Sequence, residues 1–238
     1  MSLLQIKNTH IHAIIFDFDG TLARLNIDFS RMRNAIRELL SSYGIDGNQL
    51  ANGFVLEIIK EAQALLNRQS EGAASVFVQR AYRIIEAIEL EAAERGDLFP
   101  ATRKLLQELR FAGIACAIIT RNCRAAIVKT FPDISDYCAA VVCRDNVDMV
   151  KPHPEHINKA LNIIAIPRHH TLMIGDHPLD IATGKNAGTL TAGVLTGHFK
   201  EEDFLKSGAD LVLKEAGEIL KMIKRPEEVP KSERQNPC

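Results

Sequence analysis

Six short segments of this chain are almost continuously apolar, and helical patterns lie between and after them. Such runs are typical of strands buried on both faces of a parallel sheet, because helices cover each face. The segments are 12–18, 114–120, 138–143, 171–175, 190–195 and 209–213, and the helix candidates are 101–111, 124–130, 154–164, 179–186 and 215–223. This order predicts an α/β fold, a doubly wound, Rossmann-like parallel sheet of five or six strands.

One long interval, residues 24–95, interrupts this alternation. It contains no convincing strand, only helical patterns at 29–42, 50–67 and 75–93. Because so long an insertion does not fit between neighbouring strands, it predicts a separate all-helical cap domain. The expected organisation is a discontinuous core of residues 1–23 and 96–223, a cap of residues 24–95 and a disordered, charged, proline-containing tail of residues 224–238.

The composition excludes several classes of protein. The 238 residues include 29 Lys and Arg against 30 Asp and Glu, without the positive excess of a nucleic-acid binder. No apolar run approaches the roughly 20 residues of a membrane-spanning helix, and the first residues lack the apolar stretch of a secretory signal. The five cysteines show no paired metal-type spacing. We therefore expect a soluble, cytoplasmic protein that binds neither nucleic acid nor membranes.

The strongest chemical signal is FDFDGTL, residues 16–22, at the end of the first apolar segment. Asp17 and Asp19 are two residues apart, so an extended chain points both to the same side. Two carboxylates about 4 Å apart repel by roughly 4 kcal/mol at an effective dielectric near 20. A hard cation such as Mg²⁺ compensates this repulsion best. The alternative is a polar strand end that happens to carry two acids.

A second acidic motif, GDHPLD at residues 175–180, directly follows another apolar segment. Asp176 stands at the expected strand end, and Asp180 falls in the first turn of a helix that starts near Pro178. Asp180 therefore has an alternative interpretation as an acid that favours the positive end of the helix dipole.

Thr120 and Lys151 are weaker signals on their own, since a strand-end threonine is often structural and a loop lysine is often only solvated. Their places along the chain strengthen them. Strand carboxyl ends of a parallel sheet meet at one crevice, where ligands bind. Carboxylates, a hydroxyl and an ammonium group in one crevice indicate metal-assisted phosphoryl transfer.

These four motifs together resemble those of the haloacid dehalogenase superfamily: DFDGTL, Thr120, Lys151-Pro152 and GDHPLD. With the helical insertion after the first motif, the chain looks like the phosphoglycolate phosphatase and β-phosphoglucomutase branch. The resemblance implies a Mg²⁺-dependent phosphatase acting on a small phosphate monoester, in which Asp17 is the nucleophile that forms an aspartyl-phosphate. Asp19 would be the acid and base catalyst.

The resemblance also assigns the remaining residues. Thr120 and Lys151 would bind the transferring phosphoryl group. Asp17, Asp19 (through its backbone carbonyl) and Asp176 would hold Mg²⁺, with Asp180 supporting them. The chain departs from the branch pattern at Ala23-Arg24-Leu25 after the first motif, at Arg121-Asn122 after Thr120 and at His177 within GDHPLD. These departures concern substrate specificity rather than catalysis. The residues expected near the substrate are Gly20, Thr21, Arg24, Arg121, Asn122 and His177.

The interval 24–95 contains eight arginines and one lysine. Arg24, Arg31, Arg33 and Arg37 lie near its start, and we hypothesise that at least one binds an acidic group of the substrate. The alternative is that they pair with neighbouring acids such as Asp28 and Glu38. The histidines other than His177 are expected to be solvent-exposed: His10, His12, His153, His156, His169, His170 and His198.

Three other functions remain open at this point. A phosphomutase would return the phosphoryl group to a sugar rather than to water. A phospho-accepting regulatory domain also groups acids, a threonine and a lysine, but it needs neither the long insertion nor a second catalytic acid. A catalytically silent binding protein is the third alternative. The expected partner is a small phosphorylated metabolite, and the chain is expected to be a monomer or a homodimer.

Overall fold

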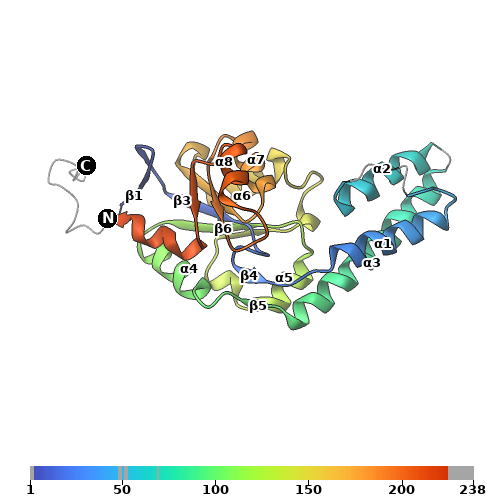
Figure 1. The fold of residues 1–238 in the computed structure, drawn as a ribbon, viewed down its shortest axis with the longest axis horizontal. Coiled ribbons are helices and arrows are strands. Elements are labelled where there is room, and N and C mark those ends of the chain that lie inside the picture. The colour runs from blue at the N-terminus through green and yellow to red at the C-terminus, as the bar shows by residue number, and fades with distance from the viewer. Residues whose placement is uncertain (1–2, 48–49, 51–52, 69, 225–238) are drawn as a thin grey trace. The chain divides into compact units, whose positions relative to one another are not determined.

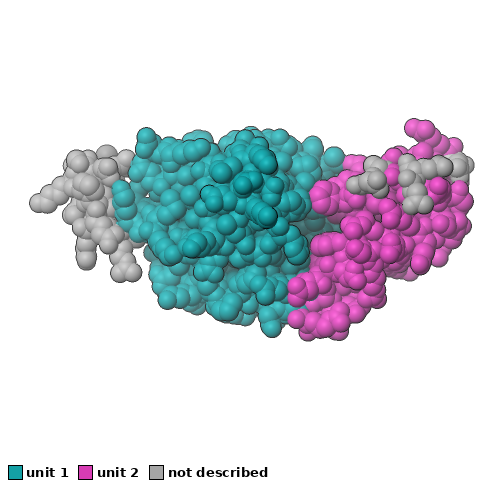
Figure 2. Space-filling view, in the orientation of Figure 1, with its two compact units in different colours: residues 1–25, 96–238 teal, residues 26–95 magenta. Residues whose placement is uncertain are grey.

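The computed structural model describes residues 3–47, 50, 53–68 and 70–224 of the chain. They divide into two compact units, residues 1–25 with 96–238 and residues 26–95 (Figure 2). The helical unit starts two residues later than the expected cap, because β4 (Ala23–Arg24) pairs antiparallel with β5 (Asp97–Leu98) in the first unit. Arg24 therefore lies in the first unit.

A six-stranded parallel sheet forms the centre of the first unit, as the sequence predicted. Its strand order is β10-β9-β8-β3-β6-β7. The strands are β3 (Ala13–Phe16), β6 (Ala115–Ile119), β7 (Ala140–Val142), β8 (Thr171–Gly175), β9 (Leu190–Val194) and β10 (Leu211–Leu213). The order runs outward in both directions from β3 and β8, which makes the sheet doubly wound and confirms the α/β fold.

Helices cover both faces of this sheet (Figure 1). One face carries α4 (Thr102–Phe111) and α5 (Arg124–Thr130); the other carries α6 (Pro154–Ile164), α7 (Pro178–Ala187) and α8 (Glu201–Lys206). On the second face, Ile15, Met173 and Val142 pack with Ile157 and Leu161 in the hydrophobic core. The faces of the sheet are therefore apolar, and its strand ends carry the polar groups.

Strand register sets the places of the predicted catalytic residues. Phe16 of β3 stands opposite Ile118 of β6 and Ile174 of β8. Asp17 directly follows Phe16, and its N–H donates to the carbonyl oxygen of Ile174 at 2.8 Å. Thr120 and Asp176 directly follow the strands on either side of β3, and each lies one residue beyond the level of Asp17.

Several parts of the first unit differ from the sequence predictions. A small antiparallel sheet that was not predicted joins β1 (Leu3–Ile6), β2 (Thr9–His10) and β11 (Ile223–Lys224). Lys224 pairs with Leu3 in this sheet, so the expected tail starts one residue too early; its residues 225–238 lie outside the described part. The helix expected at 215–223 is a 3₁₀ helix, η4 (Ala216–Met222). Shorter 3₁₀ turns are η1 (Ile134–Asp136), η2 (Arg144–Asn146) and η3 (Arg168–His170).

The second unit consists of α1 (Phe29–Ser41), α2 (Val55–Asn67) and α3 (Glu71–Arg95). Its buried residues recur at helical spacing, for example Phe77, Ala81, Ile85 and Ile88 on α3. Asp28 caps α1 by accepting the N–H of Arg31 at 2.8 Å. Among the described residues, no helix has both the length and the apolar character that crossing a membrane requires.

Candidate active site

Asp17 and Lys151 form the centre of the site. The ammonium group of Lys151 lies 2.8 Å from Oδ1 of Asp17 and 2.7 Å from Oδ1 of Asp180. Oδ1 of Asp17 also accepts the N–H of Phe18 at 2.7 Å. The side chain of Lys151 is only 3% exposed, so it holds the two carboxylates in a nearly dry environment. The residue after β3, the loop before α6 and the start of α7 therefore meet at one point.

Asp176 lies in the same cluster. Asp17, Asp176 and Asp180 each present an oxygen, and these three oxygens lie within 4.8 Å of one another. The packing depends on glycine: a Cβ on Gly20, whose φ is +80°, would overlap the Asp176 carboxylate, and so would a Cβ on Gly197. The backbone of two loops thus approaches Asp176 more closely than a residue with a side chain allows.

The charges of the cluster are unbalanced. Burial raises the pKa of Asp176 above its ordinary value, and the charges of Asp17 and Asp180 raise it further. Burial also raises the pKa of Asp180, although Lys151 acts against this. Burial favours the neutral amine of Lys151, but the charges of Asp17 and Asp180 outweigh it and raise its pKa. Three carboxylates around one ammonium therefore retain an attraction for further positive charge.

Asp19 occupies a separate place beside this cluster. Its Oδ1 accepts the N–H of Leu25 at 2.8 Å, which fixes the carboxyl group over the turn that follows β3. Burial raises the pKa of Asp19 to about 6, and the charge of Asp17 adds to the effect against the hydrogen bond from Leu25. A carboxyl group with a pKa near 6 exchanges protons readily at neutral pH, as an acid and base catalyst must.

Thr120 and Lys151 are connected through backbone groups. The N–H of Thr120 donates to the carbonyl oxygen of Val142 at 3.0 Å, at the end of β7. Oγ1 of Thr120 accepts the N–H of Asn122 at 3.2 Å. The guanidinium of Arg121 donates to the carbonyl oxygen of Lys151 at 2.9 Å. The second and third motifs thus share one hydrogen-bonded framework.

The other predicted substrate residues have mixed surroundings. Arg24 lies over the ring of Phe99, with 5.2 Å from its guanidinium carbon to the ring centroid. Nδ1 of His177 accepts the N–H of Leu179 at 2.9 Å, and its ring contacts that of Phe199. Burial lowers the pKa of His177, and the charge of Lys151 lowers it further, which favours the neutral ring.

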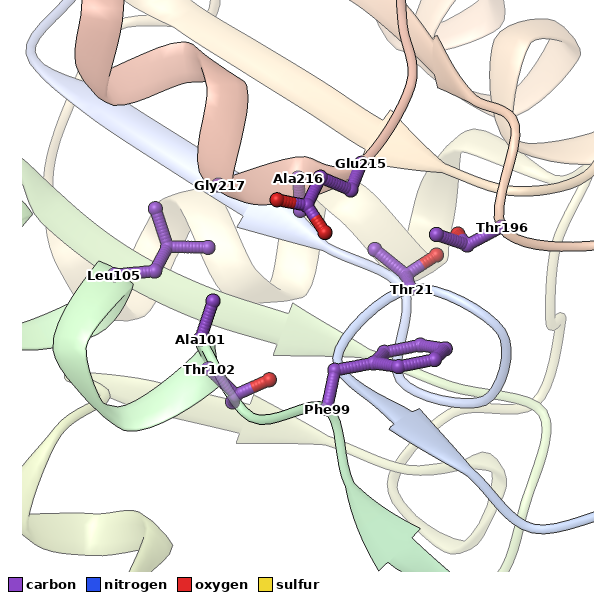
Figure 3. A pocket seen from close by; sticks show the side chains of 9 residues that line it. All are labelled: Thr21, Phe99, Ala101, Thr102, Leu105, Thr196, Glu215, Ala216 and Gly217. Atoms are coloured by element: carbon purple, nitrogen blue, oxygen red, sulfur yellow. The ribbon is translucent and has the colours of Figure 1, made fainter.

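Thr21 lines a pocket with room for about one water molecule, together with Phe99, Thr196 and Glu215 (Figure 3). Its hydroxyl is buried and has no hydrogen-bond partner among the described residues. The carbonyl of its neighbour Gly20 accepts the hydroxyl hydrogen of Thr196. The structure therefore places the side chain of Thr21 in this pocket rather than in the acidic cluster.

The haloacid dehalogenase-like hydrolase family model matches residues 14–194, more than half of the chain. The match includes all four motifs that build the site. The chain belongs to this family. The predicted superfamily and the prediction of a hydrolytic enzyme are thereby confirmed.

Relatives of this hydrolase are named as phosphatases. The N-acetylmuramic acid 6-phosphate phosphatase of Pseudomonas putida is 26% identical over 90% of this chain and 96% of its own length. The pyrophosphatase PpaX of Bacillus mycoides is 28% identical over 90% of this chain and 98% of its own length. A predicted phosphoglycolate phosphatase from Haemophilus somnus has the same fold, with a TM-score of 0.61 at 18% identity over 89% of this chain and 97% of its own.

The donor set of this hydrolase fits a divalent metal ion. Carboxylate oxygens from three residues lie within reach of one ion, and hard cations such as Mg²⁺ prefer oxygen ligands. The side-chain group consists of Asp17, Asp176 and Asp180. The resemblance implied Asp17, Asp176 and the backbone carbonyl of Asp19 as ligands, with Asp180 supporting them. The carboxylate of Asp19 accepts the N–H of Leu25, and Asp180 packs against Gly175, where a Cβ would overlap its carboxylate.

One prediction about the surroundings of the site was wrong. His156 was expected to be solvent-exposed, but it is completely buried beside the Lys151 loop. The sequence HPEHI, residues 153–157, does not indicate that His156 is buried. Spacing alone does not determine which face of this helix packs inward, and the neighbouring Ile157 is buried as well. The sequence also gives no sign that the carbonyl of Val142 joins two motifs, because every residue has a backbone carbonyl.

Several arginines of the helical unit contact other side chains of that unit. Arg31 lies 2.6 Å from Glu91 of α3, rather than against Asp28 or Glu38, and Arg95 shares the same carboxylate at 3.0 Å. Arg33 donates to the hydroxyl of Ser30 at 3.3 Å. The ion pair of Arg31 with Glu91 joins α1 to α3, and a substrate contact from an arginine of this unit stays a prediction.

Proposed function

We propose that this hydrolase is a Mg²⁺-dependent phosphatase that removes the phosphoryl group of a small phosphorylated metabolite through an aspartyl-phosphate on Asp17. The observation that carries the proposal is the cluster of Asp17, Lys151, Asp176 and Asp180 at the carboxyl ends of β3 and β8. The phosphatase names of the relatives support the reaction class.

The residues have distinct tasks in this proposal. Mg²⁺, held by Asp17, Asp176 and the backbone carbonyl of Asp19 with Asp180 in support, would neutralise phosphate charge. Lys151 lowers the repulsion between the substrate dianion and the carboxylate of Asp17, which it already contacts. Thr120 binds a phosphoryl oxygen. Oxygen of Asp17 attacks phosphorus, and the bond from phosphorus to the leaving oxygen breaks.

Asp19 moves the protons in both halves of this reaction. Its carboxyl group, with a pKa near 6, gives a proton to the leaving oxygen in the first step. In the second step it takes a proton from the water that attacks the phosphorus of phospho-Asp17. Orthophosphate then leaves, and Asp17 and Asp19 return to their starting states.

Replacing Asp17 by Asn tests the nucleophile directly. Asn keeps the size and the hydrogen-bonding shape of the side chain but not its nucleophilic oxygen, so turnover of p-nitrophenyl phosphate should fall by at least about 10³-fold. A chelator should abolish wild-type turnover, and added Mg²⁺ should restore it. Full activity of Asp17→Asn, or of the chelated enzyme, contradicts the mechanism.

The substrate is best identified by a turnover panel of phosphorylated metabolites. N-acetylmuramic acid 6-phosphate, pyrophosphate and phosphoglycolate belong in it, because proteins similar to this chain carry those names. Sugar phosphates test the phosphomutase alternative. Release of orthophosphate supports the phosphatase, whereas an isomeric sugar phosphate without orthophosphate shows a mutase.

A further inference from the structure

A buried histidine connects two of the motifs on which the proposed reaction depends. The carbonyl oxygen of Val142 accepts the N–H of Thr120 at 3.0 Å and also lies 3.0 Å from Nε2 of His156. On the other side of the ring, Nδ1 of His156 lies 3.2 Å from the backbone nitrogen of Lys151. A continuous path of hydrogen bonds therefore runs from Thr120 through Val142 and His156 to Lys151.

The partners of His156 determine its tautomer. A backbone N–H only donates, so Nδ1 must accept the bond from Lys151 and carries no hydrogen. Nε2 then carries the hydrogen and donates it to Val142. Burial lowers the pKa of His156 to about 3, and the nearby charge of Lys151 lowers it further. The ring thus stays neutral, and both hydrogen bonds keep their direction throughout the neutral pH range.

Lys151 is held at both of its backbone groups. Its N–H bonds to His156, and its carbonyl oxygen accepts the guanidinium of Arg121 at 2.9 Å. Its side chain ends between Asp17 and Asp180. Because loops are more mobile than the strands beside them, a lysine in a loop needs such restraints to keep its ammonium within a few tenths of an ångström.

We propose that His156 is a positioning residue for phosphoryl transfer: it fixes the backbone of Lys151 relative to Thr120, so that the ammonium and hydroxyl groups bind the same phosphoryl group. This inference rests on the proposed function. An apolar side chain would fill the same core position beside Ile157 and Ala160, both fully buried. An apolar residue would leave the backbone N–H of Lys151 without this acceptor, and the carbonyl of Val142 with Thr120 but without the bond from the ring.

The test compares His156→Phe with His156→Asn. Phe keeps a ring of similar size but has neither nitrogen, so Lys151 loses the restraint on its backbone N–H and keeps only the bond from Arg121 to its carbonyl oxygen. We expect kcat for p-nitrophenyl phosphate to fall 10- to 100-fold while KM changes less than threefold, because the ammonium binds the transition state better than the ground state. Asn places an oxygen acceptor near the position of Nδ1 and should recover most of the loss.

Two matched variants separate positioning from stability. His153→Ala alters another histidine of the same helix start, whose Nδ1 accepts the N–H of Glu155 at 3.2 Å and not that of Lys151. Ile157→Val loosens the core next to His156 without changing a hydrogen bond. Both should retain kcat within twofold. In a Lys151→Ala background, His156→Phe should add less than a twofold loss, because the two residues act through one group.

The outcomes distinguish the inference from the proposed function. The positioning role alone is overturned if His156→Phe retains the kcat of the wild type. It is also overturned if Ile157→Val lowers kcat as much as His156→Phe does. A loss in His156→Phe that persists in full in the Lys151→Ala background also overturns it. If the wild type hydrolyses no phosphate ester in the panel, the proposed function fails, and the inference fails with it. If His156→Phe does not fold, His156→Asn decides. A kcat of His156→Asn below one tenth of the wild-type value contradicts the positioning role.

Discussion

Lys151 shows how a single residue gathers the chemistry of the site. Its ammonium group contacts Asp17 and Asp180 while the side chain is almost fully buried. Burying a charge without a partner costs free energy. Here the ammonium group and the two carboxylates each lower the free-energy cost of burying the other. Removing Lys151 would leave carboxylates facing one another, so its contribution to binding and its contribution to folding cannot be separated by that substitution alone.

His156 provides a residue-scale prediction about pH and stability. Its folded-state pKa is near 3, whereas an unfolded histidine has a pKa of about 6.5. Between these values the unfolded chain binds the proton, so the free energy of unfolding falls as pH falls below about 6.5. At pH 5 the loss from this residue is about 2 kcal/mol.

Urea unfolding at pH 8 and pH 5 measures this effect. The decrease in the free energy of unfolding between the two pH values should be about 2 kcal/mol smaller in His156→Phe than in the wild type. Asp19, whose raised pKa gives a contribution of opposite sign, is present in both proteins and cancels in the comparison. An identical pH dependence in the two proteins would show that His156 titrates normally.

At the scale of elements, the amino end of α7 carries both a structural and a chemical task. Nδ1 of His177 accepts the N–H of Leu179, and Oδ2 of Asp180 accepts the N–H of His177 at 3.1 Å. These bonds satisfy backbone groups that the first turn of a helix leaves open. They also set the direction of Asp180, whose other oxygen binds Lys151. The helix start and the acidic cluster therefore depend on the same side chains.

Substitutions at His177 test this cap. His177→Ala removes the acceptor for Leu179 and should lower the free energy of unfolding by about 1 kcal/mol. His177→Ser keeps an oxygen acceptor and should lose less than about half of that. Both variants lose the contact with the ring of Phe199, so their difference reports the cap alone. Equal urea midpoints for the two variants would rule out a capping role.

At the scale of the whole molecule, the chain leaves and re-enters the sheet unit at one place. Ala23 pairs with Leu98, and Arg24 pairs with Asp97, as a short antiparallel ladder. The six-stranded sheet and its hydrophobic core lie entirely within the unit of residues 1–25 and 96–238. The helical unit of residues 26–95 has its own buried face. Each unit thus has a separate source of stability.

Excision of the helical unit tests this organisation. Joining Leu25 to Gly96 through Asn-Gly, a turn that suits an antiparallel pair, should give a protein that unfolds cooperatively in urea with the circular dichroism of an α/β fold. We expect turnover of the preferred metabolite to fall much more than turnover of p-nitrophenyl phosphate, since the helical unit is predicted to act as a cap.

The wild-type chain, measured on both substrates, is the control for this excision. A product that is unfolded, or one that retains full preference for the metabolite, contradicts the expected division of tasks. The first result would show that the sheet unit depends on the helical unit for stability. The second would show that the residues that select the substrate lie in the sheet unit.

The sequence alone determined the parallel sheet and the acids at its strand ends. Short, uninterrupted apolar runs are typical of strands buried on both faces, and the acids that follow them must lie outside the apolar core. Asp17, Asp176 and Lys151 could be predicted to meet for the same reason. The burial of His156 and the direct ion pair between Asp180 and Lys151 were decided only by the tertiary structure. Both depend on backbone groups, the Lys151 N–H, the Val142 carbonyl and the missing Cβ of Gly175, and no local pattern encodes where folding brings such groups together.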